Sequence, residues 1–133
     1  MNYLATSINE SPVIIGTAAS AITDVRGYAV KFNSSGAVVL AGAGDVPLGI
    51  GLMTCGDQGA IAAGADVDIQ YKDIGMVCAG AAITKGASLS VNASGQFIPA
   101  TSGTAAVAVA LGTAGAAGQY IPAILKFSAP AVS

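Results

Sequence analysis

The chain has 133 residues, of which 53% are hydrophobic and only 9% are charged, and its formal net charge is -2 at pH 7. This length fits one domain of ordinary size. The absence of histidine excludes a catalytic triad of the usual kind and an imidazole base. The five basic residues are scattered singly, which argues against nucleic-acid binding, because phosphate recognition needs clustered positive charge.

Short alternating apolar stretches, separated by turns rich in glycine, predict an all-β chain. The best candidate for a single helical turn is the segment 17–25. Residues 1–12 precede the β-pattern and are expected to form an extended arm, and residues 129–133 a flexible tail, so that 13–128 form one β-domain. The expected strands are, in chain order, 13–15, 28–32, 37–41, 48–53, 67–71, 76–78, 88–91, 96–98, 106–111 and 120–127.

One stretch of the sequence occurs twice, 59 residues apart. Residues 27–36 and 86–95 share the pattern Gly-x-x-apolar-x-apolar-Asn-x-Ser-Gly, and the match continues without a gap to Gly59 and Gly118. Asparagine and glycine tolerate the left-handed backbone of tight hairpins, so the repeated pairs predict turns. The sequence therefore predicts a compact small β-barrel or sandwich, built from two pseudo-repeated β-units at about 22–59 and 81–118. The turn-determining residues are Asn33, Gly36, Asn92 and Gly95.

Large apolar side chains are scarce, since aromatic residues make up 5% of the chain and tryptophan is absent. Burying alanine stabilises a fold less than burying leucine or phenylalanine, so a core of this kind often needs an oligomer interface to complete it. No charged residue occurs between Lys85 and Lys126, and a long uncharged stretch is usually covered by a partner. We therefore expect self-association, with this interval supplying much of the contact.

The same uncharged interval is not a membrane span, because Asn92, Gln96 and Pro99 interrupt it and no apolar run approaches the roughly 20 residues that a spanning helix needs. The N-terminus has neither a basic region nor a continuous apolar block, so it is not expected to act as a secretory signal, and synthesis in a cytoplasm is expected. Cys55 and Cys78 are then expected to be reduced and buried. A disulfide between them, or a metal site, are the alternatives.

Two further patterns suggest chemistry. Asp66 and Asp68 would lie on one face of a strand, where repulsion between like charges could raise the pKa of one carboxyl group. A cation that bridges them across a subunit contact is a second alternative, although alternation favours a solvated outer face. Gly49 and Gly51 form no nucleotide loop, because they belong to an apolar alternation and no helix start follows. The sequence therefore predicts no catalytic residue, no metal and no cofactor site.

Arg26 and Lys85 each directly precede the first glycine of the repeat. They are interpreted as solvated charges that flank turns; a pair of partner contacts is the alternative.

Glycine, alanine and alternating apolar residues make up the stretches 79–89 (AGAAITKGASL), 92–96 (NASGQ) and 108–114 (AVALGTA), with 47–51 (PLGIG) and 65–69 (ADVDI) upstream. These stretches resemble the small capsid cement, or head decoration, proteins of tailed bacteriophages. The resemblance covers roughly residues 26–127, and the strong alanine bias with almost no charge departs from the family pattern. It implies a mostly β, often trimeric protein that binds the outside of the mature head at three-fold and quasi-three-fold positions.

The resemblance leads us to expect a structural virion protein on the capsid exterior that stabilises the capsid lattice and is not an enzyme. Its expected partners are the major capsid protein and its own copies, as a homotrimer, with no nucleic acid and no membrane. The alternative is a head-fibre or adhesive β-module that displays loops for host-surface binding. Carbohydrate-binding loops usually offer exposed aromatic residues, whereas these loops consist of Gly, Ala, Ser and Thr. A small β-barrel enzyme or ligand-binding module is a third possibility, which the lack of His, Trp and polar clusters disfavours.

The N-terminal arm has spaced apolar groups and one charge. Such a segment can add an extended strand to an exposed sheet edge of a capsid subunit. A frayed terminus without a role is the alternative, in which case the loops 42–45 and 101–104 would be the anchor. The hypothetical capsid contacts are Asn2, Tyr3, Leu4, Ile8 and Glu10.

Overall fold

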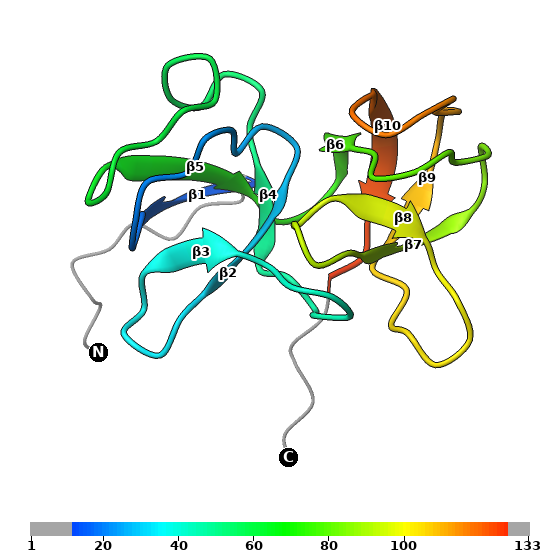
Figure 1. Cartoon of the computed structure of the whole chain (residues 1–133), viewed down its shortest axis with the longest axis horizontal. Coiled ribbons are helices and arrows are strands. Elements are labelled where there is room, and N and C mark those ends of the chain that lie inside the picture. Colours follow the sequence, from blue (N-terminus) through cyan, green and yellow to red (C-terminus); the bar gives the residue numbers. More distant parts are fainter. Residues whose placement is uncertain (1–11, 128–133) are drawn as a thin grey trace, which may run out of the picture.

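The computed structural model describes residues 12–127, which form ten β-strands in two five-stranded antiparallel sheets (Figure 1). Every strand overlaps one that the sequence predicts, so the all-β prediction is confirmed. The first sheet contains β1 (Val13–Thr17), β2 (Ala29–Phe32), β3 (Val38–Leu40), β4 (Gly49–Gly51) and β5 (Asp66–Gln70). The second contains β6 (Ile74–Cys78), β7 (Ser88–Val91), β8 (Phe97–Pro99), β9 (Ala108–Ala110) and β10 (Tyr120–Leu125).

The helical turn expected at 17–25 is wrong. Residues in this segment make bends and isolated bridges instead. Ile22 and Ile61 exchange two backbone hydrogen bonds, at 2.8 and 2.9 Å, so the backbone of this segment pairs with the β4–β5 connection rather than within a local helical turn. Among residues 12–127, no helix is long and apolar enough to cross a membrane.

The two sheets have the same internal order. The first runs β1-β5-β4-β2-β3 and the second runs β6-β10-β9-β7-β8, so each strand of the first sheet has a counterpart in the second. The pairing register agrees as well: Thr17 lies opposite Asp66 as Cys78 lies opposite Tyr120. The duplication therefore includes β1 with β6 and β5 with β10, although the sequences of these strands differ. We call residues 13–71 the first half and residues 74–127 the second half.

The gapless match between the halves does not extend to Gly59 and Gly118. The Gly118 amide donates to the carbonyl of Ala79 at 2.7 Å, and the Gly64 amide donates to the carbonyl of Ala18 at 2.9 Å. Ala18 and Ala79 each follow the first strand of their half, so Gly118 corresponds to Gly64. The connection between β4 and β5 is longer than that between β9 and β10, and Gly59 lies in the longer one.

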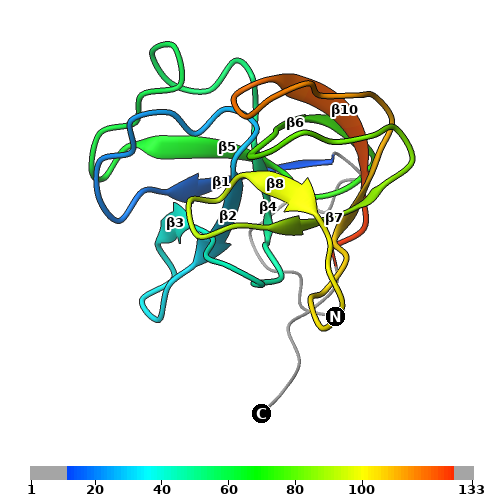
Figure 2. The ribbon, with the colours of Figure 1, turned by 45° about the vertical axis from the view of Figure 1, so that its right-hand side comes forward.

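Each sheet curls so that the strand at one edge, β3 or β8, meets the segment that follows the strand at the other edge, β1 or β6. Ala18 forms a parallel bridge with Val38, and Ala79 forms the corresponding bridge with Phe97. This curvature gives each half a barrel-like form and protects β3 and β8, which are otherwise edge strands. Figure 1 and Figure 2 show the two curled sheets side by side.

The apolar core continues from one half into the other. One cluster of buried residues belongs to the first half alone and includes Val30, Val67 and Ile69. The larger cluster joins Ala29 and Ile50 of the first half to residues of the second half. The second-half members of this cluster include Val77, Leu89, Val91, Phe97 and Ile121.

Candidate interaction surfaces

Backbone hydrogen bonds connect the two halves, and we call this contact the junction. The Cys78 amide donates to the carbonyl of Gly27 at 2.9 Å, and the Ala29 amide donates to the carbonyl of Gly95 at 2.8 Å. A third bond runs from the amide of Gly44 to a carbonyl of β7, at 3.0 Å. Hydrogen bonds of this kind fix the halves at one distance and one orientation.

Glycine allows the backbones to approach so closely. Gly27 has a φ of 70°, and a Cβ added there would lie 2.8 Å from the nitrogen of Cys78. Gly95 has a φ of 82°, and its Cβ would lie 3.1 Å from the carbonyl oxygen of Ala29. Gly27 therefore needs glycine for both the left-handed backbone and the contact. At Gly95 the left-handed backbone favours glycine, while a Cβ would need only a small shift of the Ala29 carbonyl.

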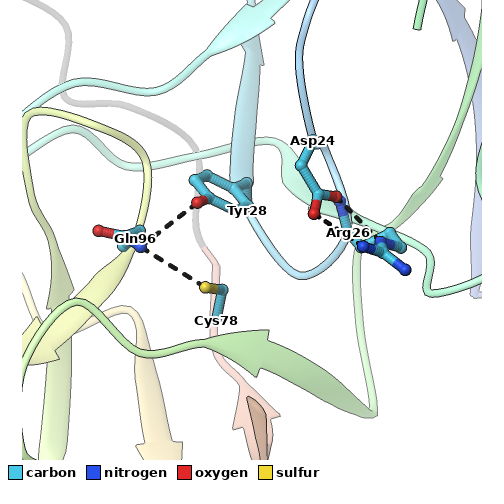
Figure 3. A network of polar contacts seen from close by, with 5 residues as sticks. All are labelled: Asp24, Arg26, Tyr28, Cys78 and Gln96. Atoms are coloured by element: carbon cyan, nitrogen blue, oxygen red, sulfur yellow. Dashed lines mark hydrogen bonds and ion pairs between the residues drawn. The ribbon is translucent and has the colours of Figure 1, made fainter. Parts of the chain in front are cut away.

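Side chains add a polar network to the junction (Figure 3). Gln96 Nε2 donates to the hydroxyl of Tyr28 at 3.3 Å and to Sγ of Cys78 at 3.6 Å. Burial raises the pKa of the Tyr28 hydroxyl, and the nearby Cys78 thiol raises it further. The Tyr28 hydroxyl therefore stays uncharged at neutral pH, and its hydrogen bond to Gln96 ties the segment just before β2 to the second half.

An ion pair lies beside this network. Arg26 donates from Nε and Nη2 to the two carboxylate oxygens of Asp24, at 3.0 and 2.9 Å (Figure 3). The hydrogen bond from Arg26 is the largest cause that lowers the pKa of Asp24. Arg26 thus has an intramolecular partner, whereas the expectation from sequence was a simple solvated charge.

The turn between β2 and β3 has the same conformation as the turn between β7 and β8. Oδ1 of Asn33 accepts hydrogen bonds from the amides two and four positions later, at 2.9 and 3.0 Å. Oδ1 of Asn92 accepts the same two bonds, both at 2.9 Å. Gly36 and Gly95 close these turns with φ of 78° and 82°. Gly95 is buried in the junction, whereas Gly36 is exposed.

The loops that follow β3 and β8 also match. Oδ2 of Asp45 accepts the amide of Gly42 at 2.7 Å, and Oγ1 of Thr104 accepts the amide of Thr101 at 3.0 Å. The carboxylate of Asp45 therefore makes the same contact in its loop as the hydroxyl of Thr104 makes in the equivalent loop. Asp45 also pairs with Lys31 at 2.7 Å, and this hydrogen bond is the largest cause that lowers the pKa of Asp45.

Exposed apolar side chains gather where the halves meet. Met53, Ile74 and Met76 are 40%, 59% and 38% exposed, and together with Pro122 they line an open groove of about 370 Å³. Sequence reasoning missed this groove. Its signal is the run of residues in β6, in which apolar side chains occupy both faces of the strand.

The residues singled out for chemistry have structural surroundings. Asp66 is exposed and Asp68 half-buried on β5, while Val67 and Ile69 between and beside them are fully buried. The outer-face interpretation is therefore right. Among residues 12–127, no group of three or more His, Cys, Asp or Glu side chains could hold a metal ion.

Both cysteines are buried free thiols. Cys55 Sγ accepts the amide of Asp68 at 3.3 Å, and burial is the main cause that raises the pKa of this thiol. Cys78 belongs to the junction network described above.

The proposed capsid contacts Asn2, Tyr3, Leu4, Ile8 and Glu10 lie outside the described residues, as does the tail at 129–133. Their role stays a prediction.

No protein-family model matches the sequence, and no curated protein matches it significantly. The structure is similar to the crystal structure of the N base of head fiber gp8.5 from bacteriophage phi29, with a TM-score of 0.65 and 16% sequence identity. The likeness covers 90% of this chain and 98% of that chain. The chain therefore has the fold of that head-fiber base along nearly all of its length.

Proposed function

We propose that the protein is a structural component of a tailed-bacteriophage head, which binds the capsid exterior and stabilises the shell. The observation that carries the proposal is the likeness to a phage head-fiber base over 98% of that chain. The resemblance of residues 26–127 to capsid cement proteins, seen in the sequence, supports the same place of action. In this proposal the protein is not an enzyme and uses no cofactor.

The fold suits such a role. Backbone hydrogen bonds at glycines and a shared apolar cluster make the two halves one rigid body. A rigid body that binds only the expanded shell shifts the assembly equilibrium toward that shell by mass action. Many copies on one lattice add their small contributions.

The partners in this proposal are the major capsid protein and further copies of the chain, as a homotrimer. The open groove beside Met53, Ile74 and Met76 offers apolar area for the capsid contact. The arm at residues 1–12 provides a second contact, by strand addition to a capsid subunit. Neither nucleic acid nor membrane is a partner.

A second candidate is the base of a head fibre, which the likeness to the gp8.5 N base favours directly. A cement protein and a fibre base both attach to the head, but only the cement protein is needed for shell stability. The experiment therefore compares heads that carry the protein with heads that lack it, under rising temperature. Earlier opening of the bare heads supports cement; unchanged heat stability with reduced adsorption to host cells supports a fibre base. Heads that never bind the protein contradict both.

A further inference from the structure

The first half and the second half contribute different faces to the junction. Because the two halves have equivalent folds, each half also carries a counterpart of the face that the other half contributes. These two counterparts take no part in the junction. On the first half the junction face contains Gly27, Ala29 and Gly44, and its counterpart on the second half contains Gly86, Ser88 and Gly103. On the second half the junction face contains Cys78, Val91 and Gly95, and its counterpart on the first half contains Thr17, Phe32 and Gly36. We call the counterparts the free faces.

Burial separates the junction faces from the free faces. Ala29 is 0% exposed, whereas its counterpart Ser88 is exposed. Val91 is 2% exposed, whereas its counterpart Phe32 is 45% exposed. A large aromatic side chain thus stands half in solvent at the position where the other half buries an apolar residue.

The free faces already have the backbone of the junction faces. On the junction face, the Ala41 amide donates to the carbonyl of Ala29 at 2.9 Å; on the free face, the Ala100 amide donates to the carbonyl of Ser88 at 2.8 Å. The turns closed by asparagine and glycine, and the loops held by Asp45 and Thr104, match as described above. No rearrangement of these segments is needed to repeat the contact.

We propose that a second copy of this chain binds its free face of the second half to the free face of the first half, and so repeats the junction between molecules. The bonds expected by equivalence run from the Ser88 amide to the Gly36 carbonyl, from Gly103 to Phe32 and from Thr17 to Gly86. This inference does not depend on the proposed role at a phage head.

Such a contact is head-to-tail, and a head-to-tail contact either closes into a ring or continues as a filament. A closed ring leaves no free face at either end. A ring of three chains would contain six copies of the same β-unit, related by one repeated contact.

The intermolecular contact lacks the polar network of the junction. The residues in place of Tyr28 and Gln96 are Ala87 and Ala37, which cannot form its side-chain hydrogen bonds. The contact between molecules is therefore weaker than the junction and depends on protein concentration.

The first test places a charge in each free face. Thr17 and Ser88 are exposed, and Thr17→Arg or Ser88→Arg would bury an unpaired guanidinium in the contact. Light scattering should show a multiple of the 12.8 kDa chain mass for the unchanged protein and the single-chain mass for each variant, with circular dichroism unchanged. Ala62→Arg and Ala116→Arg, at exposed positions that are not among the residues of either free face, should keep the oligomer. An unchanged protein that is monomeric at all concentrations, or arginine variants that both remain oligomeric, would overturn the proposal.

The second test is a disulfide between molecules. In the junction, a Cβ on Gly95 would lie 3.6 Å from Cβ of Leu40, within the roughly 3.5–4.5 Å that a disulfide spans. The counterpart pair between molecules is Gly36 and Pro99. A mixture of Gly36→Cys chains and Pro99→Cys chains should therefore give a mixed dimer on oxidation, while neither variant alone dimerises.

The matched control carries Leu40→Cys and Gly95→Cys in one chain, which tests the same geometry within a molecule. An intrachain bridge in the control without a mixed dimer would overturn the proposal. Dimers of equal yield from either single variant alone would also overturn it, since they would indicate a symmetric contact.

Discussion

Gly27 and Cys78 join the two halves of the molecule: the Cys78 amide donates to the Gly27 carbonyl at 2.9 Å, at a point where any side chain on Gly27 would touch the β6 backbone. The equivalent glycine of the second half, Gly86, has a φ of 90° and nothing within 4 Å of an added Cβ. Gly27 and Gly86 thus occupy equivalent positions of the repeat, but only Gly27 has no space for a side chain, because it lies in the junction.

Gly27→Ala should lower the free energy of unfolding by about 2–4 kcal/mol, because backbone strain at positive φ adds to the overlap with Cys78. Urea unfolding measures this loss. Gly64→Ala is the matched control, since Gly64 has a φ of 80° with open space around it, and should cost about 1 kcal/mol. Equal losses in the two variants would show that the junction is looser than described.

Gln96→Ala should cost about 0.5–1.5 kcal/mol, because it removes the two hydrogen bonds that Gln96 Nε2 donates and the long one that its Oε1 accepts from Asn92, and it leaves the half-buried hydroxyl of Tyr28 without this donor. Gln119→Ala serves as the control. Gln119 is exposed and accepts the amide of Gly115 at 2.6 Å, where water can replace it, so its loss should stay within about 0.5 kcal/mol. A smaller loss for Gln96 than for Gln119 in thermal unfolding would contradict the stabilising role of the network.

Asp45→Asn tests a pH dependence. The pKa of Asp45 is lowered from its ordinary value of 3.8, chiefly by the hydrogen bond from Lys31. Because the folded pKa is below the unfolded one, the stabilisation is present above about pH 3.8 and is lost as the pH falls through the folded pKa. Since both side chains are substantially exposed, we expect only about 0.5–1 kcal/mol at pH 7.

The control for this measurement is Thr104→Val, which removes the equivalent loop contact made by a neutral hydroxyl. Its cost should not change between pH 7 and pH 3. At pH 3, the free energy of unfolding of Asp45→Asn, measured with urea, should therefore approach that of the unchanged protein. The difference in free energy of unfolding between Thr104→Val and the unchanged protein should be the same at pH 7 and pH 3. The same pH dependence in both variants would contradict the assignment to the Asp45 carboxylate.

Deletion of residues 2–11 should leave the β-body folded and oligomeric but weaken its attachment to heads, if Leu4 and Ile8 fill pockets on a capsid subunit. Sedimentation of heads with the truncated and the full-length chain measures this. The double variant Leu4→Ser, Ile8→Ser should weaken binding as the deletion does, because it keeps the backbone and removes only the apolar groups. Undiminished binding by the deletion would shift the search for the anchor to the loops 42–45 and 101–104.

Local patterns in the sequence predicted the strands well, because alternation and glycine-rich turns report on neighbouring residues. The repeat was visible only where turn geometry fixes residue types, as at Asn33 and Asn92. The equivalence of β1 with β6 was not visible, since strands Val13–Thr17 and Ile74–Cys78 have no identical residue at equivalent positions. The unequal connections before β5 and β10 hid the match of Gly64 with Gly118.

The surfaces were harder to foresee than the strands. The junction depends on which of two equivalent faces becomes buried, and Gly27 and Gly86 look alike in the sequence. Tyr28, Cys78 and Gln96 come from three separate segments, and no local spacing connects them. Long-range packing decides both features, so they emerge only in the fold.

Cryo-electron microscopy of heads that lack the protein, before and after addition of the purified chain, tests the proposed function most directly. The account predicts additional density on the outer surface of the head after addition, into which the two curled sheets fit as one rigid body. Heads that look identical before and after addition, under conditions where the chain is folded, would contradict a role on the capsid exterior.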